Sequence, residues 1–315
     1  MNNITTVKKE YHNMTLEHYL LITYPEYSRS YMSKLIKSGM VAVNDIVSDS
    51  RLKRIIHNDK VEIEFRDKVG DTILSENIPF EIIFENDDLL VINKEEGVVV
   101  HPGAGQESGT LLNAVKHYLK EDSQPVMVNR IDKETSGIVL VAKTPKSREV
   151  YAKQFENREV SKTYLCVVSS KLNPALDSKY GTVAEDGFQI EGMIGRNKRN
   201  RKIQYLFETK VGKIKTVNRD KLNLKTADRR FSLTQFRHYN ENPAYITLSV
   251  FPVTGRTHQI RAHLKAIDFP IIGDLDYSGE KFARLMLHSW KLSIQVDGKN
   301  QNFETKIPSE FDIFL

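Results

Sequence analysis

The stretch VNRIDKETSGIVLVAK, residues 128–143, decides the fold of the larger part of this chain. Its second half, residues 138–142, is a continuous apolar run, which is typical of a strand buried on both faces. Its first half packs Arg130, Asp132, Thr135 and Ser136 into one turn. A turn uses Asp, Ser and Gly for its own backbone hydrogen bonds, but turns on rigid scaffolds also carry catalytic groups. Both interpretations of Asp132 stay open from this stretch alone.

Short strands and helices surround this turn without a regular βαβ rhythm. The apolar patterns predict strands over residues 81–84, 89–93, 163–168 and near 245–252, and helices over 111–119, 147–157 and 257–267. Such a mixture indicates an α+β domain built around a largely antiparallel sheet.

A second polar motif, TGRTHQIRAHL at residues 254–264, crowds cations into the first turns of a helix that Thr257 is expected to cap. Cations are unfavourable near the positive end of a helix macrodipole, so a carboxylate or a phosphate must compensate them. Two of the cationic residues are histidines, but their spacing of five does not suit one helix face, which disfavours a metal site. The residues concerned are Arg256, His258, Arg261 and His263.

The chain also divides along its length. Residues 1–13 are polar and are expected to form a flexible tail, 14–66 to form a unit of two short helices and a few short strands, 67–79 to be a linker, and 80–315 to be the second domain. Basic residues gather on the second helix and the loop after it, where they form either a phosphate-binding surface or a solvated helix face. They are Arg29, Lys34, Lys37, Arg51, Lys53 and Arg54.

Composition limits the class of protein. The 315 residues carry a net charge of +5, a modest basic excess that favours a polyanionic partner. A single cysteine, Cys166, excludes an intramolecular disulfide and a cysteine-rich metal site. We see no apolar stretch of signal-peptide or membrane-spanning length, so we expect a cytoplasmic protein. The basic run at residues 196–202 is interpreted equally well as an RNA-contacting arm and as a solvated loop.

Two resemblances follow from these motifs. NRIDKETSG at 129–137 is similar to the signature H-R-L-D-x-x-T-S-G of the RluA-type pseudouridine synthases, and the block at 254–264 matches that family's TGRTHQIRxHL completely. HPG at 101–103 and RLMLHS at 284–289 agree as well. Residues 14–66 resemble the small RNA-binding domain named after ribosomal protein S-four, the alpha-L motif. The resemblance therefore implies an α+β catalytic domain with a mixed, largely antiparallel sheet around a central cleft, preceded by that small domain.

The family resemblance also implies roles for individual residues. Asp132 corresponds to the catalytic aspartate, Tyr164 to the tyrosine that stacks on the target base, and Arg256 to the basic partner of the aspartate. Leu287 corresponds to an apolar wall of the pocket, and Arg130 to a residue that fills the space left by the flipped base. Lys94, His101 and Arg261 are expected to hold phosphates.

The reaction that the resemblance implies is the isomerisation of uridine to pseudouridine in structured RNA. The family modifies ribosomal RNA, transfer RNA or both, and we expect large-subunit ribosomal RNA here. It needs no cofactor, no metal and no membrane, and the family analogy indicates a monomer. Asp132 acts as a nucleophile at the sugar or at the base, and both routes stay open. Asn129 replaces the usual histidine and Glu95 the usual proline, positions where we expect activity to survive. The competing hypotheses are a non-enzymatic RNA-binding protein on the same scaffold and a metal-dependent hydrolase that uses the histidines.

Overall fold

We describe the protein from a computed structural model, over residues 2–24, 27, 29–65, 73–103, 106–120, 124–170, 187–200, 202–217 and 219–315. The chain divides into two compact units, Met1–Thr72 and Ile73–Leu315, each described by itself. The boundary between them falls inside the segment 67–79 that the sequence predicts to be a linker.

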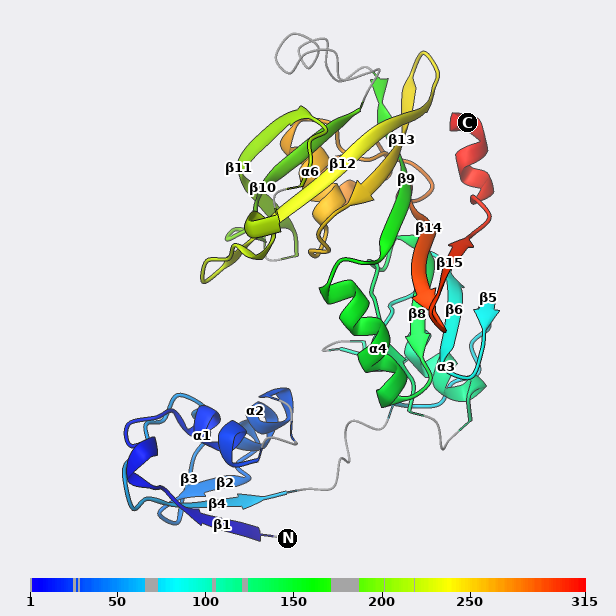
Figure 1. Cartoon of the computed structure of the whole chain (residues 1–315). Coiled ribbons are helices and arrows are strands. Elements are labelled where there is room, and N and C mark those ends of the chain that lie inside the picture. Colours follow the sequence, from blue (N-terminus) through cyan, green and yellow to red (C-terminus); the bar gives the residue numbers. More distant parts are fainter. Residues whose placement is uncertain are drawn as a thin grey trace. The chain divides into compact units, whose positions relative to one another are not determined.

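The first unit packs two helices, α1 (Leu16–Thr23) and α2 (Arg29–Lys37), with a small antiparallel sheet (Figure 1). Over the described residues, its strands follow the order β1-β4-β2-β3. Their bounds are Asn2–Thr6 for β1, Val41–Val43 for β2, Ile46–Val47 for β3 and Lys60–Glu64 for β4, and a short 3-10 helix, η1, covers Lys9–Tyr11. Leu20, Ile36, Val61 and Ile63 are fully buried between the helices and the sheet.

The flexible tail expected over residues 1–13 is wrong. Asn2–Thr6 form β1, which pairs antiparallel with β4. Val7, directly after β1, is fully buried. The hydroxyl of Tyr19 also donates a hydrogen bond to that of Thr5 at 3.0 Å. Backbone pairing and one buried apolar side chain therefore hold a segment whose polar composition suggested fraying.

The second unit is built, over the residues described, on an eleven-stranded sheet (Figure 1). The strands follow the order β11-β10-β12-β13-β9-β14-β8-β6-β5, with β15 paired to β14 and β7 to β8. Their bounds are Glu81–Glu85 (β5), Leu89–Lys94 (β6), Val126–Met127 (β7), Ser136–Ala142 (β8), Ser161–Ser169 (β9), Phe188–Arg196 (β10), Gln204–Lys213 (β11), Arg229–Glu241 (β12), Tyr245–Pro252 (β13), Leu287–Val296 (β14) and Lys299–Glu304 (β15). The described pairs are antiparallel except β14 with β8.

Helices cover this sheet. They are α3 (Leu111–Tyr118), α4 (Pro145–Glu156), α6 (Gln259–Ala266) and the 3-10 helices η3 (Arg219–Asn223), η4 (Leu275–Tyr277) and η5 (Ser309–Phe314). Every residue of β8 is buried, because its alternate side chains meet different layers. Ile138 and Leu140 share an apolar cluster with Tyr151 of α4, whereas Val139 and Val141 share one with Leu111 of α3. The prediction of an α+β domain with a strand buried on both faces is confirmed.

Much of the described chain between residues 188 and 252 forms strands. Strands β10 and β11 form an antiparallel hairpin, and β10 also pairs along β12. β10 ends at Arg196 and β11 starts at Gln204, so the described residues of the basic run, 196–200 and 202, lie at the turn of this hairpin. In that turn the Asn197 side-chain oxygen accepts hydrogen bonds from the backbone N–H groups of Arg199 (2.8 Å) and Asn200 (3.1 Å).

Candidate active site

A cavity of about 490 Å³ lies above the centre of the sheet, and many polar side chains of the sequence motifs line it. The loop before β8, the start of β9, the loop between β13 and α6, and the first residue of β14 all contribute to it. Those contributors include Asn129, Arg130, Asp132, Lys162, Tyr164, Thr254, Gly255, Arg256, Thr257, His258, Arg261 and Leu287. The volume lies within the range of about 300–1,000 Å³ that ligand pockets occupy.

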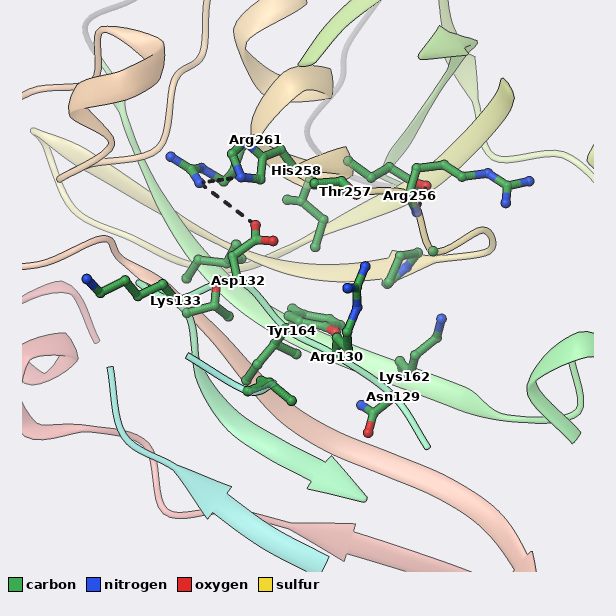
Figure 2. Close-up of a pocket in the computed structure, with 18 of the residues that line it drawn as sticks. Asn129, Arg130, Asp132, Lys133, Lys162, Tyr164, Arg256, Thr257, His258 and Arg261 are labelled. Carbon is green, nitrogen blue, oxygen red and sulfur yellow. Dashed lines mark hydrogen bonds and ion pairs between the residues drawn. The ribbon is translucent and has the colours of Figure 1, made fainter. Parts of the chain in front are cut away.

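Asp132 sits in the turn that leads into β8, and its carbonyl accepts the backbone N–H of Thr135 at 3.1 Å. Its carboxylate points towards His258 and Arg261 (Figure 2). The side chain is 23 % exposed, so it faces the cavity and not bulk solvent. Burial raises the pKa of this carboxyl, whereas electrostatic interactions with His258 and Arg261 oppose the rise.

Arg261 is the cation beside Asp132. Its Nη1 lies 3.8 Å from Asp132 Oδ2, and the residue is only 3 % exposed. A bidentate pair with Asp274 holds the guanidinium in place, with Nε–Oδ2 at 2.8 Å and Nη2–Oδ1 at 2.7 Å. Asp276 adds a third contact at 3.1 Å. Carboxylates therefore compensate this cation, as the crowding of cations in the sequence requires.

Arg256 does not fill the role that the resemblance implies. Its guanidinium points away from Asp132 (Figure 2), donating from Nε to the Phe231 carbonyl at 3.2 Å and from Nη2 to the Leu222 carbonyl at 3.4 Å. The prediction that Arg256 is the partner of the aspartate is wrong, and so is the prediction that Arg261 is free to hold phosphate. The helix geometry explains both corrections.

Helix α6 begins later than the sequence suggests. The position before it is His258, not Thr257, and His258 has a left-handed backbone with φ of 52°. The side-chain oxygen of Gln259 accepts hydrogen bonds from the Arg256 backbone N–H (3.0 Å) and from the Thr254 hydroxyl (2.7 Å). Arg256 therefore lies outside the helix on a folded-back loop, whereas Arg261 lies on its inward face.

The two histidines of this motif have separate partners. His258 Nδ1 lies 3.2 Å from the Tyr277 hydroxyl, and its Nε2 lies 3.3 Å from Arg261 Nη1. His263 is fully buried, and its Nε2 lies 2.8 Å from the Ser232 hydroxyl. Within the described part of the chain, no group of three or more His, Cys, Asp or Glu side chains is placed to hold a metal ion.

Tyr164 and Leu287 form part of the cavity wall, as the sequence predicts. They are near neighbours across two paired strands, since Ser289 of β14 lies opposite Tyr164 and Leu287 opposite Cys166. Burial raises the pKa of the Tyr164 phenol to about 12, and the nearby Asp132 charge adds to the rise. The phenol is therefore neutral at physiological pH, so an uncharged aromatic ring borders the cavity.

Lys94, expected to hold phosphate, is instead part of the framework. It is 1 % exposed, and its ammonium donates to the carbonyls of Glu95 (2.7 Å), Val98 (2.9 Å) and Lys133 (3.0 Å). These bonds tie β6 to the turn that carries Asp132. Burial lowers the pKa of Lys94 to about 8. A buried cation committed to three carbonyls cannot reach a phosphate on the surface.

The remaining predicted contacts are accessible. Arg130 and His101 are exposed and line the cavity. In the first unit, Lys34, Lys37 and Arg54 are exposed, whereas Arg29 and Arg51 approach Glu17 at 3.9 and 3.2 Å. Lys53 is half-buried. Their contact with RNA stays a prediction.

Sequence reasoning missed three residues that shape the site: Lys162, Gln259 and Asp274. Lys162 borders the cavity beside Tyr164, Gln259 folds the loop, and Asp274 holds Arg261. The sequence could have indicated Asp274, because an acidic residue directly after the apolar run 269–272 is a candidate partner for a buried arginine, which requires a carboxylate. Asn129 also has a defined task, because its side-chain oxygen accepts the Leu140 backbone N–H at 2.7 Å.

The chain is similar in sequence to RNA pseudouridine synthases. A family model described as RNA pseudouridylate synthase matches residues 88–266. The ribosomal large subunit pseudouridine synthase D of Borreliella burgdorferi is 33 % identical over 84 % of this chain and 76 % of that protein. An uncharacterized RNA pseudouridine synthase of Bacillus subtilis is 30 % identical over 98 % of this chain and 96 % of its own length.

Solved structures agree on the fold. The human protein named RNA Pseudouridylate Synthase Domain Containing 1 superposes with a TM-score of 0.55 at 22 % identity, over 74 % of this chain and 86 % of that one. Among the described residues, no helix is both long and apolar enough to cross a membrane. Since the matched family model spans more than half of the sequence, the chain belongs to the RNA pseudouridylate synthase family, whose members isomerise uridine to pseudouridine.

Proposed function

We propose that this enzyme modifies uridines in large-subunit ribosomal RNA, with Asp132 as the catalytic carboxylate. The observation that carries the assignment of Asp132 is its position: a carboxylate that faces a 490 Å³ cavity and lies 3.8 Å from a buried arginine. The ribosomal substrate is proposed from the relatives' names, since several are called ribosomal large subunit pseudouridine synthase D. We further propose that the protein works as a monomer in the cytoplasm.

The chemistry assigns a task to each part of the cavity. The glycosidic bond between uracil N1 and the sugar C1′ breaks, the base turns, and a bond from C5 to C1′ forms, while the hydrogen at C5 leaves and N1 regains one. Asp132 opens this sequence in one of two ways: its attack on C1′ displaces N1, and C5 later displaces the carboxylate from C1′, or its attack on the base forms an adduct that expels the carboxylate before the product leaves. A loose uracil must not escape, and the cavity walls at Tyr164 and Leu287 retain it between the two bonds.

The uridine must leave its base stack to reach Asp132, at a cost of a few kcal/mol. We propose that Tyr164 recovers about 1–3 kcal/mol of this cost by stacking on the uracil ring. Arg130, exposed at the cavity rim, would occupy the space the base leaves, and His101 would contact a nearby phosphate. Arg261 favours the ionised form of Asp132 against the effect of burial.

The first unit supports RNA recognition in this proposal. We propose that residues 14–66 form an alpha-L type domain and that the cations on α2 and the following loop contact phosphates. Lys34 and Lys37 lie exposed in the last turn of α2. Basic residues there gain from the negative end of the helix dipole and present charge to a polyanion.

A map of pseudouridine across all cellular RNA tests the substrate. Cells with and without the protein are compared by a chemical label that arrests reverse transcription at pseudouridine. We expect one or a few sites in large-subunit ribosomal RNA to disappear and to return with wild-type protein but not with Asp132→Asn. Lost sites confined to transfer RNA would contradict the proposed substrate, and sites restored by Asp132→Asn would contradict the proposed carboxylate.

A further inference from the structure

Two arginines from different elements converge on one carbonyl next to the active-site cavity. Arg158, just after α4, donates from Nη2 to the Leu222 carbonyl at 3.1 Å, and Arg256 donates from Nη2 to the same carbonyl at 3.4 Å. Arg158 also contacts the Asn223 side-chain oxygen at 2.9 Å. Residues 222 and 223 end η3, so this 3-10 helix holds two like charges side by side.

The pair lacks a compensating anion. Across the part of the chain that is described, neither Arg158 nor Arg256 has a carboxylate group within 4.0 Å, whereas Arg261 has four. Burial lowers the pKa of Arg256, and the charges of Arg230 and Arg158 lower it further. Two guanidinium groups so close together repel each other, so this arrangement favours the binding of an anionic ligand.

The pair borders a second cavity of about 640 Å³, lined also by Ser161, Asn223 and Pro252, with Glu156 as its one lining carboxylate. This cavity shares part of its wall with the cavity of Asp132, namely Phe155, Lys162, Pro252, Thr254, Gly255 and Arg256. Lys162 stands at the junction, and its ammonium lies 5.9 Å from the centre of the Phe155 ring. The two cavities are therefore direct neighbours.

We propose that Arg158, Arg256 and Lys162 form a phosphodiester-binding site for the nucleotide next to the flipped uridine. This inference rests on the proposed function and deepens it, since it assigns the RNA backbone a path out of the Asp132 cavity. Guanidinium groups bind phosphate oxygens through paired N–H donors, which a fixed pair of arginines provides twice. The carbonyl of Leu222 fixes both side chains in advance, so little conformational entropy is lost when the phosphate binds.

Arg256 thereby gains a task that explains its departure from Asp132. It lies on the loop between the two cavities and reaches the second, while Arg261 serves the first. Lys162 shows a complementary feature, because burial lowers its pKa to about 8. An adjacent phosphate would favour the charged form of this ammonium.

Salt-dependent binding tests the site. Full-length protein carrying Asp132→Asn, which prevents turnover, is titrated with a fluorescent oligouridylate between about 50 and 200 mM salt. We expect Arg158→Gln to weaken binding about fivefold and to lower the slope of log K against log salt by about 0.7, the loss of one contact to single-stranded RNA. Arg256→Gln is expected to do the same. Arg148→Gln on the exposed face of α4 is the matched control and keeps the wild-type slope.

A second probe separates phosphate binding from a structural effect. An oligouridylate with uncharged methylphosphonate linkages is expected to bind the Arg158→Gln variant and its parent equally well, because there is no charge left to lose. A variant slope equal to the parent's would overturn the proposal. So would an acidic peptide of equal charge that binds as tightly as the RNA and loses the same affinity with Arg158→Gln. Failure of the proposed function itself would appear separately, as pseudouridine formation by Asp132→Asn.

Discussion

Replacing Arg261 with a neutral residue should raise the pH below which the enzyme loses activity. The Arg261 Nη1 to Asp132 Oδ2 distance of 3.8 Å corresponds to about 4 kcal/mol at an effective dielectric constant of about 20, or about 3 pKa units. Asp274 and Asp276 partly neutralise the charge of Arg261, and solvent screens Asp132, which is 23 % exposed. Roughly half of the interaction energy between Arg261 and Asp132 therefore remains. We therefore expect Arg261→Gln to raise the pKa of Asp132 by about 1–2 units.

The direction of the shift in the pH profile follows from the requirement that a nucleophilic carboxylate be ionised. A higher Asp132 pKa means that a larger share of the enzyme is protonated at a given pH, so the acid limb of log kcat/KM moves to higher pH. RNA labelled with tritium at uracil C5 provides the assay, because bond formation at C5 releases that hydrogen. The matched change Arg256→Gln removes a guanidinium from the same loop region but not from Asp132. It is expected to raise KM and to leave the acid limb in place.

Stability must be measured alongside, since Asp274 is fully buried and loses its bidentate partner. Breaking a buried pair costs about 3–5 kcal/mol, and Arg261→Lys should recover part of that loss together with the charge. The reasoning is refuted if folded Arg261→Gln keeps the wild-type acid limb. It is equally refuted if Arg256→Gln shifts that limb by the same amount.

Three further predictions concern the framework of the site. Lys94→Met should lower the free energy of unfolding by about 1–3 kcal/mol in a urea titration, because three backbone carbonyls lose their hydrogen-bond donor. If stability is unchanged and RNA binding becomes less dependent on salt, Lys94 contacts phosphate after all. Burial lowers the pKa of His263 and of His288 to about 3, so between about pH 6.5 and 3 the unfolded state binds more protons and stability falls as the pH falls. At pH 5 each histidine is expected to cost about 2 kcal/mol relative to pH 7.5, and His263→Gln should flatten that slope in thermal unfolding curves; an equally steep slope in this variant would contradict the assignment. Gly137→Ala should lower the free energy of unfolding by more than about 2 kcal/mol and abolish activity, because Gly137 has φ of 111° and a Cβ there would clash with the Ser289 carbonyl oxygen. A variant of wild-type stability would show that β8 and β14 do not approach so closely.

How far the sequence predicts this structure depends on whether a feature is local. The buried strand β8 and the helix α4 follow from apolar runs and helical periodicity, and both lie within two residues or so of their predicted bounds. The site turn at Asp132 is also a local feature, marked by Asp, Ser and Gly before a strand. These elements need little tertiary information, because their own patterns specify the layer that buries them.

The partners of charged side chains are decided by tertiary structure instead. Arg256 and Arg261 lie in one motif, and only the exact start of α6 at Gln259 decides which of them faces Asp132. Lys94 follows an apolar strand and looks like an accessible cation, yet three carbonyls enclose its ammonium. Periodicity reports which face of an element is apolar, but it carries no information on the rotation of a loop or on the depth of a long side chain.

The hairpin of β10 and β11 escaped prediction for a related reason. β10 alternates buried and half-buried residues, but β11 has a single buried residue, Leu206, and carries the extra residue of a β-bulge opposite Glu191 and Met193. The bulge breaks the two-residue period on which strand prediction depends. The flank rich in arginine and lysine has no strand pattern either, and its two interpretations, an RNA-contacting arm and a solvated loop, both stay predictions.

The most direct measurement of the central claim is the conversion of uridine by purified protein. RNA from cells that lack the protein is incubated with wild-type enzyme or with Asp132→Asn, and its nucleosides are separated and quantified by mass spectrometry. We predict that wild type raises the pseudouridine content at the sites lost in those cells. We predict further that Asp132→Asn, although it binds the RNA, falls at least about 10⁴-fold in rate. Conversion by Asp132→Asn at a rate near wild type would contradict the assignment of the nucleophile.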